Sequence, residues 1–384
     1  MLPSQRARFD IPSDIAWLNA AAWGPLPRAA VEAGRAGVAR KAQPWRLPGD
    51  FAETQYARAR AAAAALIGAA PADVAIIPSV GYGVSTAAKA LDLPAGSRVL
   101  VLADDHSAPV LEWMSRAGTD GIAIDTVARP EDGDWTAAVL AAIARQPPTL
   151  ASIASVHWSD GGALDLPRIV PALRDAGAAL LVDATHAVGA GPMDVTALDP
   201  DFLVFPTYKW TLGPYGRAFL YVAPRRQGGV PLEQTAHGRR GVSAEHIPYL
   251  ADTSYLPDAR RFDMGERDHF VSLEMAAVGM ELLAALGLGS VAERLAALTA
   301  DLAEGLAGLG LGVPAAALRA PQILSVTIPG GTPAGFLARL EGQGVHVANR
   351  LGRIRISPHI YNDADDVARC VAAFRAALAS AGRP

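Results

Sequence analysis

The sequence predicts an α/β protein, with a mostly parallel central sheet in a large domain and a smaller α+β domain after it. Short apolar runs alternate with longer amphipathic segments over most of the chain, which is typical of alternating strands and helices. Several runs are apolar without interruption, as in strands that helices cover on both faces. After about residue 224, a segment rich in Arg, Gly, Pro and Tyr precedes a second helical region. Together these observations favour two packed units.

The first region alternates strands with helices. Strands are expected at residues 74–77, 98–102, 122–127, 150–156, 179–182, 202–205 and 218–222. Helices are expected around them at residues 51–67, 85–91, 108–117, 135–145 and 166–176. Gly68 and Gly177 end the first and last of these helices, and Asp134 is a cap for the fourth.

The second region begins with residues 225–263, which show no sustained period and are expected to form a long, partly functional loop region. The expected elements after it are helices at 269–286 and 291–306, a strand at 323–328, a helix at 333–341, strands at 345–348 and 353–356, and a helix at 364–379. We therefore divide the chain into an N-terminal segment (1–25), a large domain (26–265) and a small C-terminal domain (266–384).

The composition excludes several classes of protein. The chain has 384 residues, of which 51% are hydrophobic, so burial can offset the entropy of ordering it. A net charge of -4 leaves no basic field for nucleic acid or an anionic membrane. Charges interrupt the N-terminal stretch and the Ala-rich segments, so we expect no signal peptide, no membrane span and a cytoplasmic protein. The single cysteine, Cys370, lies in a helix-periodic segment, which favours a small buried hydrophobe over a reactive thiol.

Polar residues follow two of the buried strands. Asp183 ends one strand, and Lys209 follows the next. The carboxyl ends of neighbouring strands are where open α/β sheets bind ligands. Pyridoxal phosphate requires a lysine amine for a Schiff base and a carboxylate that keeps its pyridine nitrogen protonated. Lys209 and Asp183 fit these roles, although each alone is also compatible with a solvent-facing lysine and a helix cap.

A glycine-containing turn follows the first strand of the sheet. Amides at such a helix start, without side-chain crowding at Gly81 and Gly83, form a phosphate cradle that the helix dipole assists. Thr86 occupies the place of the third glycine in a dinucleotide fingerprint. This departure counts against a nicotinamide oxidoreductase.

Several motifs, in matching order, resemble class V aminotransferases. They include VDATHAVGAGPMDV and TYKWTLGPYGRAFLYV, and the resemblance runs from about residue 18 to the last helix. These proteins are fold-type I pyridoxal phosphate enzymes, related to cysteine desulfurases, kynureninases and isopenicillin N epimerase-like proteins. The resemblance implies that fold, pyridoxal 5'-phosphate as the cofactor, and a small-molecule amino-acid substrate.

By this resemblance Lys209 forms the Schiff base and Asp183 pairs with the pyridinium nitrogen. His186 stands where the family often has Gln, which donates a hydrogen bond to the ring oxygen of the cofactor. Tyr208 matches a kynureninase-like Tyr-Lys pair in which the hydroxyl reaches the phosphate, although its ring could instead pack against the sheet. The phosphate-binding turn of the family falls on Ser79, Val80 and Gly81, where Gly81 replaces the usual threonine.

Two histidines follow other strands of the sheet. His106 aligns with the position whose aromatic ring covers the cofactor. Together with Asp104 and Asp105 it is also compatible with a metal site, but no second ligand cluster stands at a recognisable spacing, and we expect no metal. His157 lies where relatives carry Asn or Gln near the cofactor or substrate, and a buried core histidine is the alternative.

The segment NRLGRIRISPHIYN resembles the family segment whose arginine binds the substrate α-carboxylate. Arg355 is the matching residue, and a planar guanidinium suits this bidentate task. Arg353 should share its strand face and is a backup, while a surface charge is the alternative for both. Asn19 and Trp23 lie in LNAAAWGPLP, which resembles the segment that lines the substrate pocket.

The segment RFDMGERDHF resembles one that reaches the cofactor phosphate of the partner subunit. Gly265, Arg267 and His269 are its matching residues. The resemblance therefore implies a homodimer with composite active sites.

The reaction is narrowed by the position of the cysteine. The resemblance implies that Lys209 removes the Cα proton of the substrate Schiff base as a general base. Desulfurase-like relatives use a cysteine on a loop before the carboxylate-binding arginine, whereas residues 342–354 contain none and Cys370 lies beyond Arg355. We predict an aminotransferase acting on an α-amino acid. The alternatives are a β-eliminating lyase or an epimerase, and then a non-catalytic binding protein on the same fold.

Overall fold

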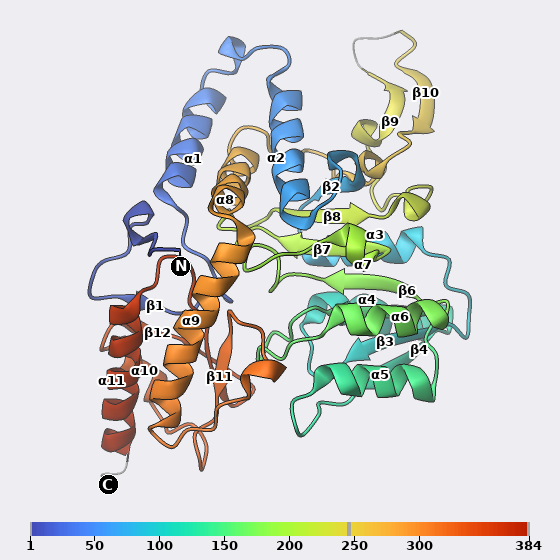
Figure 1. Ribbon diagram of the computed structural model, residues 1–384. Helices are drawn as coiled ribbons and strands as arrows, with labels where there is room; N and C mark the ends of the chain where they lie inside the picture. The colour runs from blue at the N-terminus through green and yellow to red at the C-terminus, as the bar shows by residue number, and fades with distance from the viewer. Residues whose placement is uncertain (1, 244–246, 382–384) are drawn as a thin grey trace.

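A computed structural model describes residues 2–243 and 247–381. Its centre is a seven-stranded sheet within the described residues, in the order β2-β8-β7-β6-β5-β3-β4 (Figure 1). β8 runs antiparallel to both of its neighbours, and the other neighbouring pairs are parallel. The strands are β2 (Val74–Ile77), β3 (Arg98–Leu102), β4 (Ala123–Val127), β5 (Leu150–Ala154), β6 (Ala179–Asp183), β7 (Phe202–Pro206) and β8 (Ala218–Val222). The seven strands predicted for the large domain are thus confirmed.

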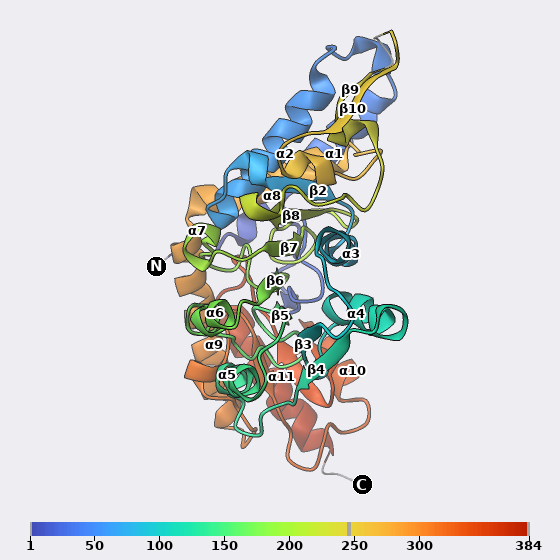
Figure 2. The ribbon, with the colours of Figure 1, turned by 90° about the vertical axis from the view of Figure 1, so that its right-hand side faces the viewer.

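Helices cover both faces of this sheet, as Figure 2 shows. On one face lie α3 (Val80–Ala90) and α4 (Ser107–Asp120), and on the other α5 (Trp135–Arg145), α6 (Leu166–Asp175) and α7 (Val195–Leu198). Alternate residues of β2 enter different cores: Ile76 packs in the core on the α5 and α6 face, and Ile77 in the core on the α3 and α4 face. Burial on both faces is the reason that these strands are apolar without interruption.

Three helices pack together at one end of the molecule: α1 (Arg28–Lys41), α2 (Phe51–Ile67) and α8 (Ser272–Leu286). The sequence did not predict α1, because its buried positions are Ala and Gly rather than large apolar residues. A Cβ on Gly37 would lie 2.1 Å from the carbonyl oxygen of Phe270. The small residues therefore let the chain before α8 approach α1 closely.

A second unit carries a three-stranded antiparallel sheet in the order β11-β14-β13, with helices beside it. Its elements are α9 (Leu288–Ala307), β11 (Leu324–Val326), α10 (Phe336–Glu341), β13 (Ala348–Arg350), β14 (Arg353–Ile356) and α11 (Ala364–Ala381). Near the N-terminus, β1 (Ala16–Trp17) pairs with β12 (Val345–His346) of this unit. Leu302 and Leu306 of α9 pack in its core, whereas Val291 and Leu295 pack in the core of the large unit. The predicted domain boundary at residue 265 remains a proposal, and residues 1 and 382–384 of the predicted segments lie outside the described residues.

The prediction of a loop at residues 225–263 was wrong in one part. β9 (Arg239–Val242) and β10 (Leu250–Tyr255) form an antiparallel hairpin that extends from the body of the protein (Figure 1). The hairpin is hard to recognise in the sequence, because its strands are largely exposed and lack regular apolar alternation. Residues 244–246 of the predicted loop lie outside the described residues.

Several boundaries also differ from the prediction, and two of the differences have a clear structural cause. Helix α3 begins at Val80 rather than at residue 85, because the Ser79 side chain caps it by accepting the amide of Tyr82. The strand predicted at 345–348 is divided into β12 and β13, which pair with different partners.

Among the described residues, no single helix has both the length and the apolar character that a membrane span requires. Only α8 and α9 meet that test together, and the chain bends by 83° between them.

Candidate active site

Four neighbouring strands of the large sheet, β7, β6, β5 and β3, end at one cavity. The residues after their carboxyl ends line it, together with Val80 at the start of α3. They include Tyr208 and Lys209 after β7, Asp183 and His186 at the end of β6, Trp158 after β5, and Asp105 and His106 after β3. The sheet thus brings most of the predicted cofactor-binding residues to one place.

Lys209 presents a buried amine to this cavity. The side chain is 7% exposed, and its Nζ lies 3.4 Å from Nε2 of His186. Burial, and then the charge of Arg355, lowers the pKa of Lys209, whereas Asp183 acts in the opposite direction, and the resulting pKa is about 7. A lysine with this pKa is largely an uncharged nucleophile at slightly alkaline pH.

His186 is held as a neutral hydrogen-bond donor. The indole Nε1 of Trp210 donates to its Nδ1 at 3.1 Å. Because an indole N–H can only donate, Nδ1 carries no proton, and the ring proton lies on Nε2, which faces Lys209. Burial, followed by the charge of Lys209, lowers the pKa of His186 well below its usual value. The ring can therefore donate to an acceptor in the cavity, as the predicted role requires.

Asp183 offers one free carboxylate oxygen. The residue is 6% exposed, and its Oδ1 accepts the amide of Thr185 at 2.9 Å. Its Oδ2 forms no hydrogen bond with any described residue. A buried carboxylate in this state requires a cationic or hydrogen-bonding partner, and a protonated pyridine nitrogen is such a group.

The start of α3 provides a site for an anion. The first amides of the helix, at Val80 and Gly81, have no acceptor within the helix. A Cβ on Gly81 would meet no atom within 4 Å, so the space there is open. Tyr208 also lines the cavity. Its hydroxyl stays protonated, because burial and, to a smaller extent, the neighbouring Tyr215 raise its pKa. Amides, helix dipole and hydroxyl together suit a phosphate.

Arg355 reaches the site from the small unit. It is 2% exposed, and its Nη1 donates to the carbonyl of Trp158 at 2.5 Å. Its Nε has no partner, and it forms no ion pair with a carboxylate of any described residue. Burial, followed by the charge of Arg350, lowers the pKa of Arg355 to about 9. A buried, unpaired guanidinium of this kind can accommodate a substrate carboxylate.

The N-terminal segment lies close to these groups. Asn19 forms a parallel bridge with Ser357, two residues after Arg355, and its buried Oδ1 has no partner. The amide of Gly24 donates to the carbonyl of Tyr208 at 2.9 Å. The ring of Trp23 is not enclosed with them, since the residue is 64% exposed.

The structure does not bring His157 into the cavity. Its ring stacks on Trp135, with the centroids 4.6 Å apart, and its Nε2 lies 3.1 Å from the carbonyl of Ala103. Its Nδ1 lies 3.0 Å from the Ser159 hydroxyl. The next residue, Trp158, lines the cavity instead.

Arg267 also lies outside the Lys209 cavity of its own chain. It pairs with Asp263 at 2.5 Å, and its guanidinium lies 3.6 Å from the ring centre of Tyr56. It lines a different cavity, beside Arg60. Nearby, the amide of Gly265 donates to Glu233, and Nδ1 of His269 lies 3.0 Å from the Tyr56 hydroxyl. A contact of this segment with the cofactor of a partner subunit remains a proposal.

Trp158 and Asp105 also line the Lys209 cavity, and neither was predicted from the sequence as a cofactor-binding or catalytic residue. The ring of Trp158 meets His106 edge to face, with the centroids 5.8 Å apart. Burial raises the pKa of Asp105 to about 7, and its Oδ2 has no partner. The sequence singled out Asp105 only as part of a metal alternative, although its place between a strand end and His106 was a usable signal. Within residues 2–243 and 247–381, no group of three or more His, Cys, Asp or Glu side chains is placed to hold a metal ion.

Comparisons with known sequences agree on one family. The family model described as "Aminotransferase class-V" matches residues 38–370. The uncharacterized aminotransferase YcbU of Bacillus subtilis is 29% identical over 322 residues, which cover 84% of this chain and 82% of YcbU. Isopenicillin N epimerase of Streptomyces clavuligerus is 26% identical over an alignment that covers 97% of each chain.

Solved structures share the whole architecture. The cysteine desulfurase CsdA of Escherichia coli matches with a TM-score of 0.85 at 19% identity, over 98% of each chain. The cystine C-S lyase C-DES matches with a TM-score of 0.83 at 20% identity, over 94% of this chain and 98% of that one. These likenesses confirm the predicted fold class.

Proposed function

The chain belongs to the class V aminotransferase family, and from this premise we propose that it transfers the amine of an α-amino acid with pyridoxal phosphate as its cofactor. The observation that carries the proposal is the buried Lys209 amine in a cavity that also holds the Asp183 carboxylate. The residues present fit the cofactor, because an amine, a carboxylate, a hydrogen-bond donor and an anion-binding helix start border the same space.

Each group of the cofactor has a counterpart in this cavity. Bound pyridoxal phosphate supplies an electron sink that stabilises negative charge at the substrate Cα. Lys209 would hold it covalently, and Asp183 would pair with its pyridine nitrogen. The start of α3 and the Tyr208 hydroxyl would hold its phosphate, and Nε2 of His186 would donate to its ring oxygen.

The proton transfers are assigned to Lys209. Its Nζ takes the proton that leaves the substrate Cα, and a pKa of about 7 suits a base that works near neutral pH. Arg355 orients the substrate by holding its α-carboxylate, so that the Cα–H bond is presented to Lys209.

Sulfur chemistry of the desulfurase kind has no nucleophile here. The single cysteine, Cys370, is buried in the core of the small unit, and burial, followed by Asp366, raises the pKa of its thiol. A thiol in that position cannot attack a substrate bound beside Lys209.

Epimerisation is a second candidate, and Asp105 is the observation that favours it. Its carboxyl has a pKa of about 7 and lines the same cavity as Lys209. An epimerase requires one group to remove the Cα proton and another to return a proton on the other side. Lys209 and Asp105, which line the same cavity, would be the candidates for these two groups.

An amino-acid panel separates these reactions. The purified protein is loaded with pyridoxal phosphate and given each amino acid with and without pyruvate or 2-oxoglutarate. We expect amine transfer that depends on the keto acid. Release of ammonia and a keto acid without an acceptor would indicate a lyase. Inversion of the Cα centre with solvent deuterium incorporated would indicate an epimerase, and the absence of all three reactions would overturn the proposal.

Two broader expectations are kept as proposals. We infer a homodimer, supported by the resemblance of the segment around Arg267 to one that completes a partner's site, and we propose a cytoplasmic location. Sedimentation of the loaded protein and fractionation of cells test them.

A further inference from the structure

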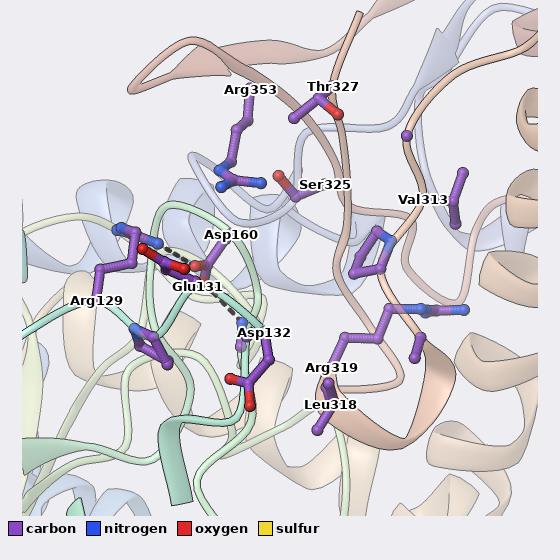
Figure 3. Close-up of a pocket in the computed structure, with 16 residues that line it drawn as sticks. Arg129, Glu131, Asp132, Asp160, Val313, Leu318, Arg319, Ser325, Thr327 and Arg353 are labelled. Atoms are coloured by element: carbon purple, nitrogen blue, oxygen red, sulfur yellow. Dashed lines mark hydrogen bonds and ion pairs between the residues drawn. The ribbon is translucent and has the colours of Figure 1, made fainter. Parts of the chain in front are cut away.

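A second cavity, of about 370 Å³, lies between the two units. Residues 129–133, after β4, and Asp160, after β5, line its large-domain side. Ser325 of β11 and Arg353 of β14 line its small-domain side. Figure 3 shows the guanidinium of Arg353 directed toward Arg129 and Asp160 across this space, with Ser325 beside it.

The strand register explains why the two small-domain residues share this face. Ile354 and Ile356 of β14 are buried in the small-domain core, so the alternating residues Arg353 and Arg355 lie on the other face of the sheet. Ser325 stands directly opposite Arg355 in the neighbouring strand and shares that face. The face that meets the large domain therefore carries basic and hydroxyl groups.

The side chains of Ser325 and Arg353 lack partners within the part of the chain that the structure describes. Ser325 is 1% exposed, and its Oγ has no hydrogen-bond partner. Arg353 is half-buried, and its side chain forms no hydrogen bond or ion pair with any described residue. A buried hydroxyl without a partner is costly, and a guanidinium beside it favours an anionic acceptor. A carboxylate would satisfy both groups.

The charges around the cavity indicate what else the ligand carries. Arg129 is already paired with Asp104 and Asp160. Arg353 and Arg319 also line the cavity, and neither is paired with a carboxylate of a described residue, although Arg319 donates to Thr299. Glu131 and Asp132 form an acidic rim: both are exposed, and neither makes an ion pair with a described residue. An acidic rim opposes ligands with several negative charges and favours a positive group at the opening.

The loop at residues 157–162 separates this cavity from the active site. Trp158 faces the Lys209 cavity, whereas Asp160 and Gly162 face the second one. Arg355 donates to the carbonyl of Trp158 and does not line the second cavity. The two cavities can therefore hold different molecules.

We propose that the second cavity binds a small zwitterionic carboxylic acid, with its carboxylate against Arg353 and Ser325 and its cationic group at the acidic rim. The volume suits a molecule of amino-acid size. This site is additional to the proposed substrate site at Arg355.

Glycine betaine is a suitable probe, because its quaternary nitrogen cannot react with a cofactor held at Lys209. Calorimetry on the pyridoxal phosphate-loaded protein should show one molecule bound per chain, about tenfold more tightly than choline or pivalate, which carry only one of its two charged groups. The absence of saturable betaine binding, or equal binding of all three compounds, would overturn the proposal.

Matched variants locate the probe. Arg353→Met should weaken betaine binding at least about tenfold, whereas Arg355→Met should weaken it much less, because Arg355 does not line the second cavity. The reverse result would place betaine in the Lys209 cavity and overturn the proposal. Ser325→Ala, which removes one unpartnered oxygen, should weaken binding without loss of folding, as judged by the unfolding temperature.

The acidic rim is tested separately. A double substitution, Glu131→Gln with Asp132→Asn, should reduce the preference for betaine over pivalate and leave pivalate binding in place. An unchanged preference would contradict the assignment of the cationic group. These titrations also work on protein that binds no cofactor, so failure of the proposed function and failure of this site give different results.

Discussion

The two walls of the candidate active site are built differently. The large domain supplies Lys209 and Asp183 from the ends of adjacent parallel strands, so an amine and a carboxylate line one cavity at the edge of one sheet. The small domain supplies Arg355 from within an antiparallel strand, where it has no carboxylate partner among the described residues. The difference is the basis of the division of work that we propose, in which the large domain would hold the cofactor and move protons and the small domain would hold the substrate. Substitutions on the two walls should therefore have different signatures.

The largest effect is expected at Lys209. Lys209→Ala removes both the attachment point and the base, so turnover should fall by at least about 1000-fold. The chain has only three lysines, Lys41, Lys89 and Lys209, which makes the attachment easy to map. After borohydride reduction, mass spectrometry should find the cofactor on Lys209.

Lys89→Ala is the matched control for this prediction. Lys89 is exposed, and its amine donates to the carbonyl of Leu232 on the surface. This variant should keep the visible absorption of the loaded protein and its turnover. Cofactor attached to Lys89 or Lys41 in the wild type would contradict the assignment of the large-domain wall.

The next largest effect is expected at Asp183. Asp183→Asn keeps the shape and the hydrogen bond from the Thr185 amide but removes the charge that would pair with the pyridine nitrogen. Turnover should fall by about 100-fold, because electrostatic stabilisation of the developing charge is lost. The visible absorption of the loaded protein should persist, since Lys209 is intact. Full turnover in this variant would show that Asp183 is not the partner of the ring.

Substitution of Arg355 should give the opposite signature. Arg355→Met should raise the KM for amino acids by about 100-fold, equivalent to roughly 2–3 kcal/mol for a hydrogen-bonded charge pair, with little change in cofactor binding. Simple amines, which lack a carboxylate, should be much less affected. Arg355→Lys should recover only part of the loss, because an ammonium lacks the planar fork. Loss of the cofactor absorption in Arg355→Met would mean that Arg355 takes part in cofactor binding, which would contradict its assignment to substrate binding.

A smaller effect couples the two walls through pH. Burial and the charges of Arg355 and Arg350 favour the neutral amine of Lys209, while Asp183 favours the ammonium, with a resulting pKa of about 7. The rate at which pyridoxal phosphate attaches to the cofactor-free protein should therefore rise with pH and level off above about pH 7, since only the neutral amine reacts.

Arg355→Met tests the sign of this coupling. Removing a nearby positive charge makes the ammonium of Lys209 less unfavourable, so its pKa should rise and the midpoint of the rate profile should move to higher pH. The attachment rate is measured by stopped-flow absorbance across the pH range. A midpoint that stays in place or moves to lower pH would show that the two walls are electrostatically independent.

The sequence could predict the large-domain wall because of how that wall is built. Asp183 and Lys209 follow consecutive parallel strands, so their order along the chain becomes their order along the sheet edge. Arg355 lies on a different unit, and its place followed from the resemblance rather than from any local pattern.

Other features could not be obtained from the sequence. His157 and Trp158 are consecutive after β5, and side-chain packing on Trp135 decides which of them faces the cavity. The cavity at Arg353 is formed by segments near residues 130, 160 and 325, which belong to different units. Sequence periodicity does not predict that these segments lie close together. Helix α1 was also not predicted, because close packing against its neighbours places small residues rather than large apolar ones at its buried positions.

The smallest effect is expected at Cys370, which lies in the small domain but on neither wall. It is fully buried in a core with Phe374 and Leu302, and its thiol is kept protonated because burial raises its pKa. Cys370→Ala should lower the free energy of unfolding by about 1 kcal/mol, as the loss of one buried sulfur does, and should leave kcat/KM unchanged. Urea unfolding and initial rates with the best substrate of the panel measure the two quantities. A large loss of turnover without a loss of stability would mean that the sulfur takes part in the reaction, and the division of work between the two walls would then have to include it.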